Sequence, residues 1–378
     1  MTRPAVGAIV APMNPLRMHE VHEALGGRFS GLADMEVVSD YGDPSAEYAA
    51  VRTAVGVVDL GFRGRLCLTG SDRVRLLNGQ VTNDVKALAT GHGCAAAFCS
   101  PKGRLVADVV IHALPDELLL DFEPGLSTAL VERLEHHIVA EDVQVVDVTP
   151  HYGLLTLQGP RAAETLSRLE LFESLPEKPL QITTAGNETL GELYLARRSR
   201  AGLPGFDLYV PVDSQEAVLD HLAAAARDCG GRLAGFEALD LARFEAGLPR
   251  FPVDMDETHL PPEAGLDRDA ISYSKGCYTG QETIARIRTY GQVTKALRGL
   301  QLPDDGAPLP MKGDKLMRNG REAGSITSAR ESAFLRGRFA LGYVRKESNA
   351  PGTELILVSG GRESTVRVVD LPFPQREV

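Results

Sequence analysis

The pattern of hydrophobic and polar positions predicts a mixed lobe of strands and helices in the first part of the chain. The apolar runs GRLVADVVIHAL and ELLLDF meet at a turn containing Asp116, as expected for an antiparallel hairpin. The following segment, GLSTALVERLEHHIVA, places Leu130, Leu134 and Ile138 on one helical face. This succession of hairpin and helix favours an α+β lobe over a regular βαβ array.

A second mixed lobe and an all-β segment are predicted further along the chain. The strand YGLLTLQ ends at Gly159 and Pro160, and a helix, the hairpin ELYLARRSRAGLPGFDLYVPV and two more helices follow. From about residue 295 the pattern changes to short strands between turns, of which Asn319-Gly320 is a strong hairpin signal. We expect a small C-terminal barrel or sandwich.

Composition and charge narrow the class of protein. The chain has 378 residues, of which 43% are hydrophobic and 24% charged, as in a folded multi-lobed protein. A net charge of −11 argues against broad binding of nucleic acid or anionic membranes, because such surfaces need clustered Lys and Arg. His19 and His22 lack a third ligand nearby, so we expect no metal site.

The cysteines and the apolar runs indicate where the protein works. Five cysteines, an odd number without a CxxC pair, suit a reducing compartment better than a disulfide scaffold. The apolar stretch VGAIVAPM is too short for a signal peptide, and we find no apolar run of membrane-spanning length. We therefore expect a cytoplasmic protein with no membrane segment.

The stretch SKGCYTGQET is the strongest candidate for chemistry. Thr279 and Glu282 have the spacing of a capping box, which predicts that a helix begins at Gly280. Cys277 would then lie just outside a helix N-terminus, and Lys275 would add a positive charge, two influences that favour a thiolate. The alternative is that Cys277 is a small buried hydrophobe and that Glu282 is only a cap.

The octapeptide KGCYTGQE resembles the signature of the YgfZ-type folate-binding proteins, relatives of the glycine-cleavage T-protein (aminomethyltransferase, GcvT). Other segments support the resemblance by their order and spacing: GSDRVRLLNGQVTNDV, LLTLQGPRAAETL, ARFEAGLPRFPVDMDE, GSITSA, ALGYV and the terminal LPF. The resemblance implies an α+β, three-lobed ring with folate in its central cavity. It also implies a folate-binding module over residues 14–290, with lobes at about 50–145 and 146–290, and a β-barrel over residues 296–378.

The resemblance also implies roles for individual residues. Glu245 matches the T-protein glutamate that accepts the two N–H donors of the pterin, a bidentate arrangement that suits a carboxylate. The working thiol would be Cys277, assisted by Lys275. Further folate-binding residues would be Tyr278, Gln281 and Arg288. The anionic folate tail needs a cation, and the choice stays open among Arg197, Arg198, Arg200 and Arg288.

Two departures from the T-protein pattern bear on activity. The T-protein carries an Asp where this chain has Val106 and Ala107, and Asp108 comes one or two residues later, a slip that would turn it to the opposite face of a strand. Gln281 stands where T-proteins have an arginine. We therefore expect a tetrahydrofolate-binding YgfZ-like protein that supports iron–sulfur enzyme maturation. The alternatives are an aminomethyltransferase and a non-enzymatic partner of RNA-modifying or iron–sulfur enzymes.

Overall fold

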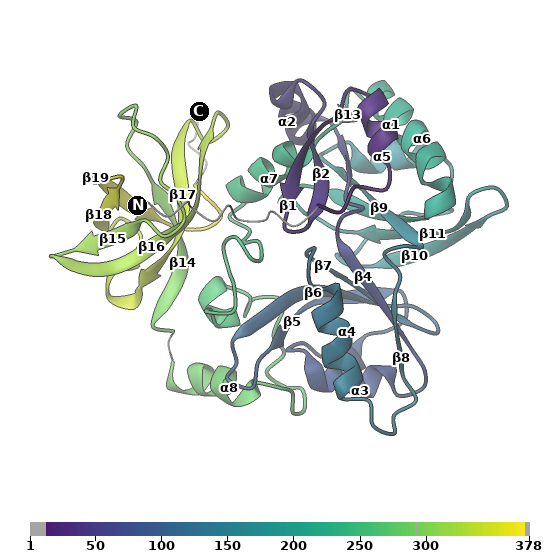
Figure 1. Cartoon of the computed structure of the whole chain (residues 1–378), viewed down its shortest axis with the longest axis horizontal. Coiled ribbons are helices and arrows are strands. Elements are labelled where there is room, and N and C mark those ends of the chain that lie inside the picture. The colour runs from purple at the N-terminus through teal and green to yellow at the C-terminus, as the bar shows by residue number, and fades with distance from the viewer. Residues whose placement is uncertain (1–12, 292, 375–378) are drawn as a thin grey trace, which may run out of the picture.

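The computed structural model describes residues 13–291 and 293–374, which form three lobes (Figure 1). The first lobe contains a five-stranded sheet with the order β5-β6-β7-β4-β8. Its strands are β4 (Gly64–Thr69), β5 (His92–Cys99), β6 (Leu105–Ala113), β7 (Leu118–Phe122) and β8 (Gln144–Asp147). The helices α3 (Arg73–Gln80) and α4 (Ser127–His136) pack their buried leucines against one face of this sheet. The predicted hairpin is confirmed, with Ala113 paired to Leu118.

The second lobe contains a six-stranded sheet with the order β10-β11-β12-β9-β3-β13. Its strands are β3 (Gly56–Asp59), β9 (Tyr152–Gln158), β10 (Ile182–Asn187), β11 (Gly191–Arg197), β12 (Gly205–Pro211) and β13 (Arg232–Leu233). The helices α5 (Ala162–Ser167) and α6 (Gln215–Asp228) pack through apolar side chains on one face. Strand β3 comes from before the first lobe and pairs with β9.

The opposite face of the six-stranded sheet is covered by elements from distant parts of the sequence. These elements are β1 (Arg28–Leu32), β2 (Met35–Asp40), α2 (Pro44–Thr53) and α7 (Phe236–Glu245), whereas α1 (His19–Ala24) packs Val21 against the cluster of α5 and α6. Val38 and Val51 of the N-terminal segment share one hydrophobic cluster with Leu154 of β9 and Leu239 of α7. This packing fixes α7 between the sheet and the third lobe (Figure 1).

The third lobe is a closed antiparallel barrel with the order β14-β17-β16-β15-β18-β19, so the choice between barrel and sandwich is resolved. Its strands are β14 (Lys295–Gln301), β15 (Lys315–Arg318), β16 (Arg321–Ser332), β17 (Gly337–Arg345), β18 (Glu354–Ser359) and β19 (Arg362–Val369). The turn between β15 and β16 is the predicted Asn319-Gly320 pair, with φ angles of 51° and 73°. The predicted α+β, three-lobed fold with its C-terminal barrel is therefore confirmed.

Polar contacts join the barrel to the rest of the molecule through α7 and the chain after it. Asp254 accepts hydrogen bonds from the hydroxyl groups of Thr327 (2.9 Å) and Ser328 (2.5 Å) on β16. Arg330, also on β16, reaches Asp240 of α7 at 2.9 Å. The barrel therefore has a defined position relative to α7.

The capping box predicted for α8 (Gln281–Tyr290) is wrong, although the helix begins close to the predicted residue. Gly280 occupies the N-cap position at φ 85°, and no side chain caps the helix there. Glu282 is 86% exposed and pairs with Arg286 at 2.7 Å. Gly291 ends the helix at φ 91°.

Two further predictions are that the chain has no membrane-spanning segment and no metal site at His19 and His22. Within the described residues, no helix has both the length and the apolar character needed to cross a membrane. The side chain of His19 bonds Glu36 (2.7 Å), and that of His22 bonds Asp59 (2.9 Å) and Tyr41. The two histidines therefore have protein partners of their own.

Candidate functional site

A cavity of about 950 Å³ lies where the first two lobes meet α7 and the loop after it. Strands β5 and β6 form one wall, the connection between β11 and β12 forms another, and α7 with residues 248–250 completes it. Its apolar lining includes Leu60, Phe62, Phe236 and Leu239. The cavity is therefore a partly open space with aromatic and aliphatic walls, of the size that binds small ligands.

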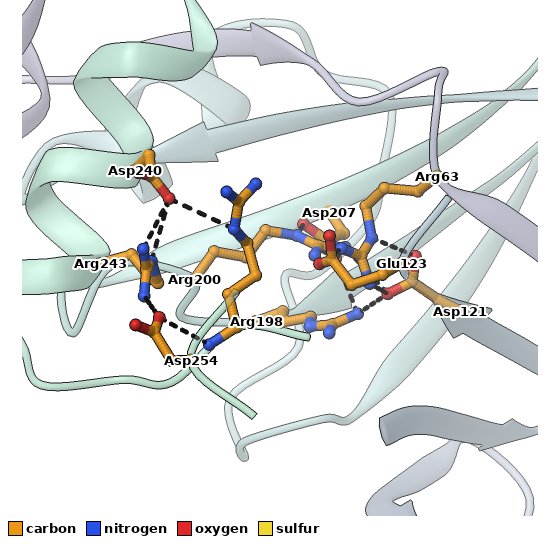
Figure 2. Close-up of polar contacts among 10 residues, drawn as sticks. Arg63, Asp121, Glu123, Arg198, Arg200, Asp207, Asp240, Arg243 and Asp254 are labelled. Atoms are coloured by element: carbon orange, nitrogen blue, oxygen red, sulfur yellow. Dashed lines mark hydrogen bonds and ion pairs between the residues drawn. The ribbon is translucent and has the colours of Figure 1, made fainter. Parts of the chain in front are cut away.

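A buried set of three arginines and three carboxylates occupies the side of the cavity between the two sheets (Figure 2). Asp121 of β7 is fully buried and is paired with Arg63 (2.8 Å), Arg200 (3.1 Å) and Arg198. Asp207 of β12 holds Arg200 at 2.7 Å, and Glu123 pairs with Arg63. The three guanidinium groups hold the pKa of Asp121 well below its usual range.

Asp108 lies beside this set but has a different electrostatic environment. It stands on β6 between Ala107 and Val109, whose side chains pack into the first-lobe core, so its own side chain faces the cavity. Its Oδ1 atom is enclosed and has no hydrogen-bond partner among the described residues. Burial, and secondarily the charge of Glu123, raise the pKa of Asp108 to about 6, against the opposing effect of Arg63 and Arg198.

The orientation of Asp108 corrects one expectation from the sequence. Counting from the preceding glycine suggested that a slip of register would turn this carboxylate away from the site. The alternation along β6 instead buries Ala107 and Val109 in the core and presents Asp108 to the cavity. A carboxylate is therefore available inside the cavity.

A second charged set surrounds the cavity end of α7. Arg243 binds Asp240 (2.8 Å) and Asp254 (2.6 Å) (Figure 2). Arg250 lies 3.5 Å from Asp240. With Arg330 at 2.9 Å, Asp240 is approached by three arginines, which lower its pKa below its usual value despite its burial. Two carboxylates thus face three guanidinium groups at this end of the cavity.

Glu245 lies at the end of α7 and is not among the described residues that line the cavity. The Tyr48 hydroxyl donates to its two oxygens at 2.7 and 2.6 Å, and Ser332 of the barrel donates at 2.6 Å. Arg52 lies 3.7 Å away. The structure thus places Glu245 where it joins α2, α7 and the barrel, and not where we expected a pterin ligand.

The ammonium of Lys275 is buried among backbone carbonyl groups. Its Nζ donates to the carbonyl oxygens of Asn78 (2.6 Å), in the last turn of α3, and of Val81 (2.7 Å) and Asn83 (2.5 Å), just beyond its end. Burial lowers the pKa of Lys275 to about 8. These three hydrogen bonds satisfy carbonyl groups at the C-terminal end of the helix and attach the octapeptide KGCYTGQE to the first lobe. The charge of Lys275 therefore interacts with these carbonyl groups.

The other predicted site residues also lie away from the cavity lining. Cys277 is exposed, and Tyr278 packs into an apolar cluster with Phe251 and Ile284. Gln281 begins α8, and Arg288 lies over the ring of Tyr273 at 4.1 Å, where it lines a separate pocket of about 750 Å³ beside the barrel. The structure therefore does not bring these residues together with Asp108.

The charged residues at the cavity that the sequence analysis did not assign to the site are Asp108, Asp121 and Arg63. Arg198 and Arg200 were candidates for the folate tail, but both are engaged by Asp121 and Asp207. A signal was present in the run ELLLDF, because a charged residue inside an otherwise apolar buried strand requires a partner. Nothing local indicated which arginine would supply it.

Comparison with known proteins shows the family to which the chain belongs. Residues 18–275 match the GCVT N-terminal domain, and residues 295–374 match the glycine cleavage T-protein C-terminal barrel domain. The chain belongs to the glycine cleavage T-protein (GcvT) family. The crystal structure of glycine cleavage system aminomethyltransferase T from Bartonella henselae has the same fold, with a TM-score of 0.86 over 96% of this chain and 99% of that one, at 24% identity.

Related sequences align along nearly the whole chain and are named aminomethyltransferase. The protein from Symbiobacterium thermophilum is 32% identical over 376 residues, covering 94% of this chain and 96% of its own length. The protein from Thermotoga maritima is 29% identical over 366 residues, covering 94% and 96%. These relatives favour the aminomethyltransferase alternative over the YgfZ-type interpretation.

Proposed function

We propose that the protein binds a reduced folate in the cavity between its first two lobes and transfers an aminomethyl-derived one-carbon unit to it. The observation that carries the proposal is the Asp108 carboxylate, which faces the cavity with an unpartnered oxygen within the described structure. A carboxylate in this position can act on an amine that becomes cationic during the reaction. The family and its aminomethyltransferase relatives support the same reaction class.

The residues present fit a reduced folate. The cavity of about 950 Å³ lies within the range of volumes that hold small molecules. Phe62 and Phe236 offer aromatic surface for the flat rings, and the enclosed Oδ1 of Asp108 has an unused hydrogen-bonding position. The arginines around the cavity favour a ligand that also carries anionic groups.

The proposed reaction requires the carboxylate of Asp108 in its ionised form. Reduced folate supplies two amine nitrogens that accept the methylene carbon, while the donor's sulfur leaves as a thiol and its nitrogen leaves as ammonia. The two protons lost by the amines are those gained by the thiol and the ammonia. Ionised Asp108 stabilises the positive charge that develops at the transferred carbon and orients the reacting amine.

Ammonia release and methylene transfer, measured with an aminomethyl-lipoyl carrier protein and tetrahydrofolate, test this proposal. We expect kcat/KM to fall as the pH is lowered through about 6, because protonation of Asp108 removes the charge that the step requires. Glu123, Arg63 and Arg198 face the same carboxylate, so their charges set the midpoint. A rate that is flat across this range would exclude Asp108 as the titrating group.

The exposed thiol favours a second function, that of a YgfZ-type folate-binding protein in which Cys277 works on an iron–sulfur enzyme. Cys277 is exposed, whereas Cys67, Cys94 and Cys99 are buried or half-buried. Burial raises the pKa of Cys94 and that of Cys99 to about 12, which suppresses their thiolates. All five cysteines are free, which suits the cytoplasm that we propose as the compartment.

Alkylation separates this thiol from the others. With iodoacetamide under native conditions we expect Cys277 to be modified before any other cysteine, because reagent reaches it without unfolding. Peptide mass spectrometry of the modified sites provides the readout. Resistance of Cys277 until denaturant is added would contradict its assignment as a working thiol.

Complementation then distinguishes the two functions. If the second function is the cellular one, Cys277→Ser fails to restore iron–sulfur enzyme activity in cells lacking the protein, while its aminomethyl transfer is unaffected. If aminomethyl transfer is the cellular function, Cys277→Ser fully corrects the defect of cells lacking the protein. Asp108→Asn does not complement in that case.

A further inference from the structure

Arg65 is a buried arginine whose charge is not matched in the way that its neighbours' charges are. The residue is 1% exposed, and its Nη2 atom donates to the backbone carbonyl oxygens of Gly61 (3.2 Å) and Thr149 (3.3 Å). Its Nε and Nη1 atoms are enclosed and have no hydrogen-bond partner among the described residues. Burial lowers the pKa of Arg65, whereas the pKa of Arg63 is raised despite its burial, because Asp121 pairs with it. Arg65 is therefore a buried cation in need of a negative partner.

Arg65 and Tyr209 enter the same layer between the two sheets. Along β4, Leu66 packs into the first-lobe core, so its neighbours Arg65 and Cys67 face the second lobe. Cys67 shares a hydrophobic cluster with Tyr209 of β12, in the second lobe. After burial and Asp121, Tyr209 is the group that affects the pKa of Arg65 most, which requires the two side chains to lie close together. The two residues therefore lie near each other in the lobe interface.

The hydroxyl group of Tyr209 is also buried without a partner. Tyr209 is 1% exposed, and its hydroxyl forms no hydrogen bond with the described residues. Its ring meets the ring of His112 on β6 edge to face, with centroids 6.5 Å apart, so the side chain reaches the first-lobe sheet. Burial raises the pKa of Tyr209 above its usual value, so the hydroxyl keeps its proton. The hydroxyl is therefore available as a second donor in this layer.

The free groups of Arg65 and Tyr209 favour a small anion over water or a larger ligand. A guanidinium group has only donors, and an anion that accepts them also neutralises the charge, which water cannot do. Neither residue is among the described residues that line the cavity between the lobes, so the layer is closed to a molecule of substrate size. A polyatomic oxyanion would leave some of its oxygens without donors there. A halide ion, which is spherical and monovalent, needs only the donors that these two side chains offer.

We propose that Arg65 and Tyr209 bind a chloride ion between the first two lobes and that this ion helps to hold the two sheets together. Arg65 contributes from β4 of the first lobe and Tyr209 from β12 of the second, so the ion bridges the two lobes. It gives Arg65 the negative partner that Asp121 gives to three other arginines. Chloride binding here does not depend on the proposed function, because neither residue is among the described residues that line the cavity.

Urea unfolding across a chloride titration tests the site in solution, with potassium gluconate keeping the ionic strength constant. The unfolding constant should fall roughly tenfold at a chloride concentration ten times the Kd, because chloride binds only the folded state. Arg65→Met should abolish this response, since it removes the charge and its donors. Tyr209→Phe should weaken chloride binding by roughly tenfold, the effect of one hydrogen bond to a charged group. Tyr343→Phe is the matched control and should respond like the wild type, because it removes a buried hydroxyl without a described partner from β17 of the barrel.

Bromide locates the ion directly. A crystal soaked in potassium bromide should show an anomalous peak, at the bromine absorption edge, between the Arg65 guanidinium and the Tyr209 hydroxyl. No peak at this position, or an equal chloride response in wild type and Tyr209→Phe, would overturn the proposal. A peak without any chloride response in solution would mean binding at crystal concentration only and would overturn it as well. If Arg65→Met does not fold, the Tyr209→Phe titration and the bromide peak decide by the same criteria.

Discussion

Asp108→Asn is expected to lower kcat for aminomethyl transfer by roughly two to three orders of magnitude, the typical loss when one preorganised electrostatic group is removed from an active site. The amide keeps the size of the carboxylate but removes the charge that opposes the developing cation. Affinity for tetrahydrofolate should change far less than kcat, because the effect is confined to the transition state. Steady-state kinetics and calorimetry on the same preparation measure the two quantities.

A matched control for this variant lies on the same hairpin. Asp116 is exposed in the turn between β6 and β7, so Asp116→Asn alters a carboxylate near Asp108 in sequence but outside the cavity. Its kcat should equal that of the wild type. Full activity of Asp108→Asn, or equal losses in the two variants, would contradict the role assigned to Asp108.

Asp121→Asn is expected to reduce the free energy of unfolding by roughly 3–5 kcal/mol, the loss seen when one member of a buried ion pair is removed. Asp121 is fully buried and is the shared partner of Arg63, Arg198 and Arg200, which come from both N-terminal lobes. Without its charge, these three guanidinium groups repel one another in an enclosed space. Urea unfolding followed by circular dichroism measures the change.

The pair formed by Glu164 and Arg161 on the surface provides the comparison. Glu164 is exposed and lies 2.8 Å from Arg161, so Glu164→Gln should leave the urea midpoint unchanged within error. Removing a charge from the buried network should lower the urea midpoint, whereas removing a charge from this exposed pair should not. Asp121→Asn with the midpoint of the wild type would show that the arginine set does not depend on Asp121.

The elements formed by local periodicity could be predicted from the sequence. The hairpin of β6 and β7 and the helix α4 follow from the spacing of apolar residues that are only a few positions apart in the sequence. The same alternation of apolar positions predicts that Asp108 lies on the face of the strand opposite the core. The core face is formed by Leu105, Ala107, Val109 and Ile111, which are all apolar and buried. Counting positions from a glycine missed this, since a family spacing does not fix the register of a strand.

The contacts that decide the site join residues far apart in the sequence. Glu245 meets Tyr48, 197 residues away, and Ser332, 87 residues away, so no local pattern could show that its oxygens were already used. Lys275 likewise reaches a carbonyl 197 residues earlier. Such pairings depend on how the lobes pack, and the helical pattern of α7 alone did not separate Asp240 and Arg243, which line the cavity, from Glu245.

A crystal structure of the protein with bound tetrahydrofolate is the most direct test of the central claim, that reduced folate binds between the two lobes with its reacting nitrogens beside Asp108. We predict density for the pteridine in the cavity of about 950 Å³, with an amine within hydrogen-bonding distance of the Asp108 carboxylate. Folate bound instead in the pocket between α8 and the barrel, or in the reverse orientation with its tail at Asp108, would contradict the account.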